Sequence, residues 1–129
     1  MYLGVVLIWV DGWQLQCCGH SITVGSAISC DCAAVDRSWL SAIIGADQAT
    51  RVDYMEEHHD GYIIFRVRGV VRGVDAVCCS YDVDPLTKIA SPISDSSSRQ
   101  SFETVSGHER GAPSKDLVGY LVTIDVTEQ

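Results

Sequence analysis

The sequence WVDGWQLQCCGH, residues 9–20, contributes most to predicting the fold of this chain. It begins with two tryptophans on either side of Asp11-Gly12, a pair typical of a tight turn between two strands. After the turn, Trp13, Leu15 and Cys17 alternate with polar residues, as on the buried face of a strand. The stretch therefore predicts a β-hairpin that builds part of the core.

Length and composition indicate one folded domain over residues 1–129. Hydrophobic residues make up 47% of the 129 residues, which is enough for a core without disulfides or metals. The formal net charge is −8. Non-specific binding to nucleic acid needs many Lys and Arg side chains to neutralise phosphates. We therefore do not expect nucleic acid as a partner.

The N-terminal residues 1–10 are apolar but predict neither a membrane span nor a secretion signal. They carry no positive charge, and Asp11 ends the run after ten residues. The six cysteines form the close pairs Cys17/Cys18, Cys30/Cys32 and Cys78/Cys79, which is not the spacing of a secreted disulfide framework. We therefore expect a cytoplasmic protein with reduced thiols and no membrane partner.

Alternating or continuous apolar residues predict strands along most of the chain. These strands cover residues 2–10, 13–17, 22–32, 50–55, 62–81 and 120–127. Because both ends of the chain read as strands, they can pair and close the sheet. The predicted fold is mainly β, a small bent β-barrel (SH3-like or OB-like) with one short capping helix. A β-sandwich is the alternative.

The capping helix is predicted over residues 37–44. Asp36 is a favourable N-cap residue, Gly45 is a natural stop, and Trp39 is expected to be the main apolar anchor. Residues 82–116 are rich in Pro, Ser and Gly, which predicts a long loop region that is either functional or mobile.

Cysteine and histidine side chains point to zinc as a candidate ligand. Zinc takes four such ligands in a tetrahedral arrangement, and the candidates are Cys17, Cys18, His58 and His59. Adjacent cysteines on a strand point to opposite faces, so one of the two would join one of the histidines across the sheet. In the plainer alternative, the cysteines are small buried hydrophobes and residues 56–60 form a solvated turn.

Two other groups of residues have weaker functional interpretations. Cys18-Gly19-His20 places a thiol near an imidazole, as a cysteine-dependent enzyme would require. Arg66, Arg68 and Arg72 share one face of a predicted strand and could bind a single-stranded nucleic acid. Outward arginines that pair with carboxylates across a sheet are the commoner explanation.

Four motifs resemble a family of small uncharacterised actinobacterial proteins, a domain of unknown function. They are WVDGWQLQCCG at 9–19, Val24-Gly25, EEHH at 56–59 and VGYLV at 118–122. The resemblance implies a bacterial, cytoplasmic protein and favours the Cys-Cys-Gly and Glu-Glu-His-His segments as parts of one site. Cys30 and Cys32 lie outside these motifs. The resemblance implies no activity.

The leading functional hypothesis is a non-enzymatic small-barrel protein that binds zinc through Cys17 or Cys18 with His58 or His59. The second hypothesis is a metal-free interaction module whose 82–116 region contacts a protein partner. The third is a cysteine-dependent enzyme, so the sequence leaves open whether the protein is an enzyme and favours a non-enzyme.

Overall fold

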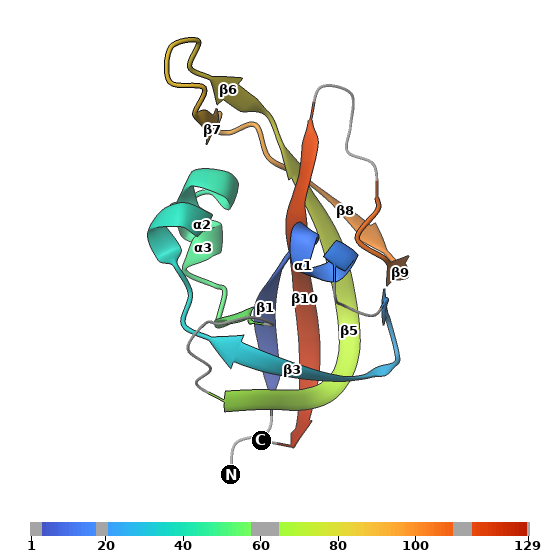
Figure 1. Cartoon of the computed structure of the whole chain (residues 1–129). Helices are drawn as coiled ribbons and strands as arrows, with labels where there is room; N and C mark the ends of the chain where they lie inside the picture. Colours follow the sequence, from blue (N-terminus) through green and yellow to red (C-terminus); the bar gives the residue numbers. More distant parts are fainter. Residues whose placement is uncertain (1–3, 18–20, 58–64, 110–114, 129) are drawn as a thin grey trace.

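The computed structural model describes residues 4–17, 21–57, 65–109 and 115–128. The fold is mainly β and contains a closed five-stranded barrel, as the sequence predicted (Figure 1). Around the barrel, the strands follow the order β10, β1, β4, β3 and β5, and β5 pairs again with β10. The bounds are β1 Val5–Asp11, β3 Ala27–Ala33, β4 Tyr54–Glu56, β5 Phe65–Cys79 and β10 Asp116–Glu128.

The two terminal strands pair with each other, as predicted. β1 runs antiparallel to β10, with Trp9 opposite Leu121, and parallel to β4, with Trp9 opposite Met55. β5 is a long curved strand, and its pairing with β10 shifts register opposite Gly73 (Figure 1). Gly69 and Gly73 lie in this curved part of β5. The predicted start of the strand at residues 62–64 lies outside the described residues.

The predicted hairpin after Asp11 is wrong. Residues Gly12–Cys17 form a short helix, α1, so Trp13 does not face the core as a strand residue would. The reason is tertiary. β1 already has β10 on one edge and β4 on the other, so no edge is left for a strand at 13–17. Leu15 of α1 instead reaches the core from the end of the barrel.

Short strands interrupt the region 82–116 that was expected as a long loop. They are β6 Tyr81–Val83 with β7 Ala90–Pro92, β8 Ser98–Phe102 against β5, and β9 Thr104–Val105, which pairs with β2 Ile22–Thr23 from outside the region. β6 and β7 form a hairpin that projects beyond the barrel (Figure 1). We call residues 81–93 the arm.

The helix predicted over 37–44 is confirmed as α2, Arg37–Ile44, and α3, Ala46–Ala49, follows it. Asp36 accepts a hydrogen bond from the backbone N–H of Trp39 at 3.1 Å, so it caps the first turn as predicted. Gly45 ends α2 at φ +90°, a conformation that other residues rarely adopt.

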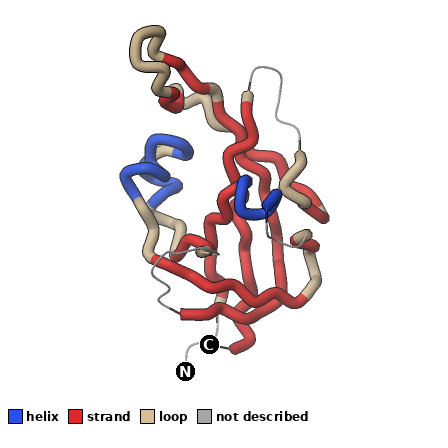
Figure 2. The backbone as a smooth tube through the Cα atoms, in the orientation of Figure 1, coloured by secondary structure: helices blue, strands red, loops and turns tan. Residues whose placement is uncertain are grey.

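Trp39 is not the main anchor of α2. It is 38% exposed, whereas Leu40, Ile43 and Ile44 are buried. Those three side chains lie on the face of the helix turned toward the barrel, and Trp39 flanks that face. Figure 2 shows α2 and α3 together on one side of the strands.

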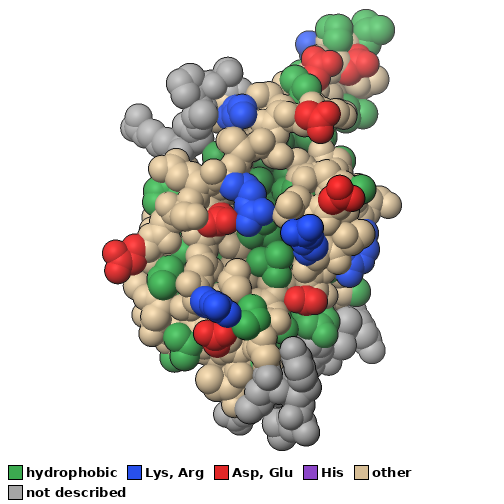
Figure 3. All heavy atoms as spheres, turned by 180° about the vertical axis from the view of Figure 1, so that it is seen from behind, with side chains coloured by type: hydrophobic (Ala, Val, Ile, Leu, Met, Phe, Trp, Pro, Cys, Tyr) green, Lys and Arg blue, Asp and Glu red, His purple; other side chains and the backbone are tan. Residues whose placement is uncertain are grey.

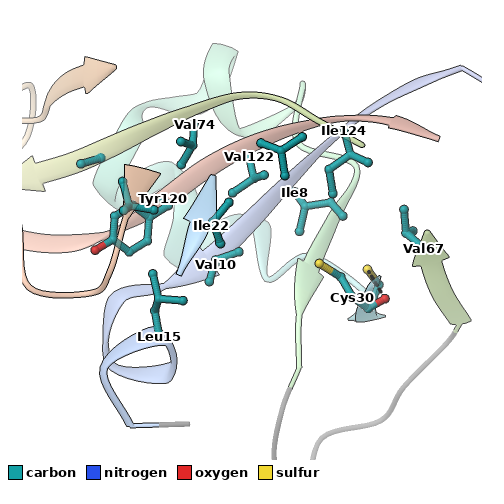
Figure 4. Close-up of a cluster of buried hydrophobic side chains, with 14 of the residues drawn as sticks. Ile8, Val10, Leu15, Ile22, Cys30, Val67, Val74, Tyr120, Val122 and Ile124 are labelled. Atoms are coloured by element: carbon teal, nitrogen blue, oxygen red, sulfur yellow. Dashed lines mark hydrogen bonds between the residues drawn. The ribbon is translucent and has the colours of Figure 1, made fainter. Parts of the chain in front are cut away.

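Two apolar clusters explain why β1 is apolar on both faces. Ile8 and Val10 point into the barrel, where side chains from β2, β3, β5, β10 and α1 converge (Figure 4). Trp9, between them in sequence, points outward and packs under the helices with Leu40 and Leu121. Successive residues of a strand point to opposite sides. A strand between two apolar layers therefore needs no polar face.

Candidate functional site

A pocket of about 470 Å³ opens beside the start of α1, in the size range of small-molecule sites. Four parts of the fold form it: the end of β1 with the start of α1, then α2, β6 and the beginning of β10. Its lining residues are Asp11, Gly12, Trp13, Trp39, Tyr81, Leu117 and Val118. We call it the aromatic pocket.

Three aromatic side chains, Trp13, Trp39 and Tyr81, line this pocket. Trp13 is 54% exposed, and Trp39 is 38% exposed although its ring packs edge-on against buried Trp9, with ring centroids 5.8 Å apart. Tyr81 is partly buried, and burial is the main cause that raises the pKa of its hydroxyl to about 12. Tyr81 is therefore neutral at physiological pH.

Asp11 is the charged group that lines the aromatic pocket. Its Oδ1 accepts a hydrogen bond from Trp9 Nε1 at 2.7 Å, and its Oδ2 accepts one from Gln14 Nε2 at 3.3 Å. Both donors are neutral, and no ion pair joins Asp11 to another residue in the described part of the chain. A carboxylate has about four acceptor positions. Within the described ranges, Asp11 therefore lines the pocket without a cationic partner.

The arm next to the aromatic pocket exposes several large apolar side chains. Leu86 at its tip is 92% exposed, and the others are Val83, Ile89 and Ile93. The tip itself is ordered by Asp84, whose Oδ1 accepts hydrogen bonds from the backbone N–H groups of Leu86 and Thr87 at 2.8 and 3.1 Å. The apolar side chains of the arm therefore take no part in holding its turn.

The predicted zinc ligands largely fall outside the described structure. Cys18, His58 and His59 lie outside the described residues, and Cys17 is the last residue of α1, with its side chain also outside them. Within the described ranges, no group of three or more His, Cys, Asp or Glu residues could hold a metal ion. The zinc site at these four residues stays a prediction.

Cys30 and Cys32 occupy the barrel interior beside Glu56. Burial, and then the nearby carboxylate of Glu56, raises the pKa of Cys30 well above its usual range and that of Cys32 to about 12. A thiol that stays protonated is a poor nucleophile. Cys30 and Cys32 therefore fit the alternative interpretation, in which the cysteines are small buried hydrophobic side chains. Glu56, expected in a solvated turn, is instead the buried last residue of β4.

The arginines predicted on one face of β5 pair with carboxylates of neighbouring strands. Arg66 Nε lies 2.7 Å from Asp31 Oδ1 on β3, and Arg72 Nη1 lies 3.7 Å from Asp125 Oδ1 on β10. Figure 3 shows basic and acidic side chains interspersed over the back of the molecule. The pairing explanation is therefore confirmed for Arg66 and Arg72.

The sequence did not predict the aromatic pocket. Trp13 and Trp39 were both assigned to the core, and Tyr81 was taken only as the end of a strand. These residues lie far apart along the chain and meet because α2 packs over the outer face of β1. The signal available in the sequence was the position of Trp39 at the edge of the apolar stripe of α2.

Fold and pocket together define a small β-barrel protein with a surface pocket and a projecting arm. The chain belongs to a family of unknown function, DUF6578, whose model matches residues 4–126. No curated protein and no solved structure matches it. None of the described helices has the length and apolar character needed to cross a membrane. The actinobacterial motif pattern, the bacterial source and the cytoplasmic location stay predictions.

Proposed function

We propose that the protein is a non-enzymatic interaction module that binds a protein partner through its arm. The observation that carries this proposal is the exposure of four large apolar side chains on one short hairpin, with Leu86 at its tip. Such groups are scattered singly on ordinary surfaces, and several close together mark a contact surface. The apolar side chains are presented on an already ordered turn, so binding would cost little conformational entropy.

The test is a variant in which the arm keeps its turn and loses its apolar tip. In the double variant Leu86→Ser/Ile89→Ser, Asp84 still caps the turn, because it binds backbone N–H groups. The full chain is cross-linked in cells of its natural host, and the attached proteins are identified by mass spectrometry. With the native chain, we expect to recover one partner protein in an amount close to that of the chain itself. With the arm variant, we expect this partner to be lost.

The matched control is Val5→Ser, which removes an exposed apolar side chain far along β1 from the arm. It should recover the same protein as the native chain does. The urea concentration at the unfolding midpoint should be the same for both variants and for the native chain. Equal recovery with the arm variant and the native chain would rule the arm out as the contact surface.

Zinc binding is the second proposed function, and one feature of the fold favours it. β4 lies parallel to β1, with Met55 opposite Trp9, so Glu56 and Asp11 end neighbouring strands on the same side. The two strands that precede the predicted ligand segments therefore end at one side of the barrel. This arrangement supports a shared site of Cys17 or Cys18 with His58 or His59.

Elemental analysis of protein purified without a histidine tag tests the zinc proposal. We expect near-stoichiometric zinc, and we expect the double variant His58→Ala/His59→Ala to lose it. His108, which lies on the segment after β9, provides the control, since His108→Ala should retain the metal. A folded native protein that carries no zinc after growth in zinc-supplemented medium would end this proposal.

A further inference from the structure

We propose that the aromatic pocket binds an organic ammonium group, through cation–π contacts with its rings and attraction to the carboxylate of Asp11. The proposal goes beyond partner binding by the arm, and it does not depend on it. It concerns a separate concave site with its own chemistry, formed at the base of the arm by residues of β1, α1, α2, β6 and β10.

The first argument is the composition of the pocket wall. Two indole rings and a phenol ring line one space of about 470 Å³, together with the apolar side chains of Leu117 and Val118. The face of an aromatic ring is electron-rich, so it attracts a cation within about 6 Å of the ring centre, and tryptophan attracts it best. A purely apolar ligand would use the same rings but would gain nothing from a carboxylate beside them.

The second argument is the sign of the charge around the pocket. Asp11 lines it and is held by neutral donors only, as described above. Asp116, the first residue of β10, also acts on Tyr81, since its negative charge contributes to raising the pKa of that hydroxyl. Lys115 lies close enough to act on Cys79, where its influence is smaller than that of Asp116. Among the described residues, the charged side chains near the pocket are therefore mainly acidic, and the chain as a whole carries −8.

The third argument is an unused acceptor in the same hydrogen-bond network. Oε1 of Gln14 is buried and has no hydrogen-bond partner among the described residues, although the other end of that amide binds Asp11. Buried polar atoms without partners are rare. Gln14 itself does not line the pocket, and its neutral amide leaves Asp11 as the charged lining group, which favours a cationic ligand over an anionic one.

The indole of Trp13 is 54% exposed and lines the pocket. It projects from a helix of six residues whose contribution to the core comes from Leu15. Trp39 is 38% exposed and packs edge-on against Trp9, while Leu40, Ile43 and Ile44 anchor α2. Two partly exposed tryptophans that line one pocket with a carboxylate supply the groups that attract an ammonium ion.

The experiment compares two ligands of the same shape that differ in charge. Choline carries a trimethylammonium group, and 3,3-dimethylbutan-1-ol replaces its nitrogen with carbon. The chain has three tryptophans, so their indole N–H signals can be followed by NMR during titration of the full chain. We expect choline to shift the Trp13 and Trp39 signals in a saturable way, and the neutral alcohol to bind at least about tenfold more weakly.

Single variants locate the site. Trp13→Leu should weaken choline binding about tenfold, and Asp11→Asn should weaken it by a similar factor while keeping an acceptor for Trp9. Asp47→Asn is the matched control, because Asp47 is an exposed carboxylate on α3 outside the pocket, and we expect it to bind choline as the native chain does. Equal binding of the two ligands, no saturation, or an unchanged affinity in Trp13→Leu would overturn the proposal.

A further titration distinguishes a free amine from a side chain of a protein. A short peptide that carries one trimethyl-lysine should bind more tightly than choline if a protein supplies the ammonium group, and no more tightly if a free amine does. Both results retain the ammonium site. The arm variant should lose its protein partner and still bind choline as the native chain does. This result would show that the two proposals are independent of each other.

Discussion

The Trp9→Ala variant is expected to lose about 3–5 kcal/mol of unfolding free energy, the usual cost of removing a large buried side chain. Trp9 is completely buried between the barrel wall and α2, in contact with the cluster that also contains Leu40 and Leu121. Its removal leaves a cavity that neither the closed barrel nor the helix can fill by a small shift. Domains of this kind have a total stability of only about 5–15 kcal/mol.

Urea unfolding followed by circular dichroism measures this loss. Trp13→Ala is the matched control, because the same side chain is removed from a site where it is 54% exposed. We expect the control to lose about 1 kcal/mol or less, as surface substitutions do. Equal losses in the two variants would contradict the assignment of Trp9 as the link between barrel and helices.

The Gly119→Ala variant is expected to lose about 3 kcal/mol, the upper end of the usual cost of overpacking. A Cβ at this position would lie 2.5 Å from the carbonyl oxygen of Val10 and 2.5 Å from Cζ2 of Trp9. The first contact is with backbone of the paired strand, so relief would require β1 and β10 to move apart. Glycine is needed here because of this close approach.

Gly73→Ala on β5 is the control for Gly119→Ala, since a Cβ there meets nothing within 4 Å. The unfolding free energy of Gly73→Ala should differ from that of the native chain by less than about 1 kcal/mol. It can even rise, because alanine lowers the conformational entropy of the unfolded chain. The costs of Gly119→Ala and Trp9→Ala should not add, because the first substitution displaces the ring that the second removes. Full additivity, or an equal loss in Gly73→Ala, would show that the contact with Trp9 is unimportant.

Much of the barrel could be predicted from local patterns. The alternation at 120–127, the apolar run at 2–10 and the glycine-containing ribbon ending near Tyr81 all became barrel strands. Asp36 and Gly45 marked the ends of α2 because capping depends on neighbouring backbone groups, which the sequence contains. Predictions of this kind succeed where the partner of a residue lies a few positions away.

The turn after Asp11 shows where local patterns fail. Asp-Gly favours a hairpin, and alternation over 13–17 favours a strand. Yet six residues can also form a helix with Leu15 inward, and the choice depended on whether β1 had a free edge. Both edges were taken by segments more than forty residues away, β4 and β10. The pattern of residues 9–20 contains no information about those distant partners.

The sequence by itself determined the mainly-β class, the strand character of both chain ends, the bounds of α2 and the acidic charge. These properties depend on side-chain periodicity, capping and composition, which are local. Only the tertiary structure decided that Trp13 and Trp39 are exposed around Asp11, that Glu56 is buried, and that the arm presents its apolar tip. These properties depend on which elements pack together, and packing is set by the shape of the whole barrel.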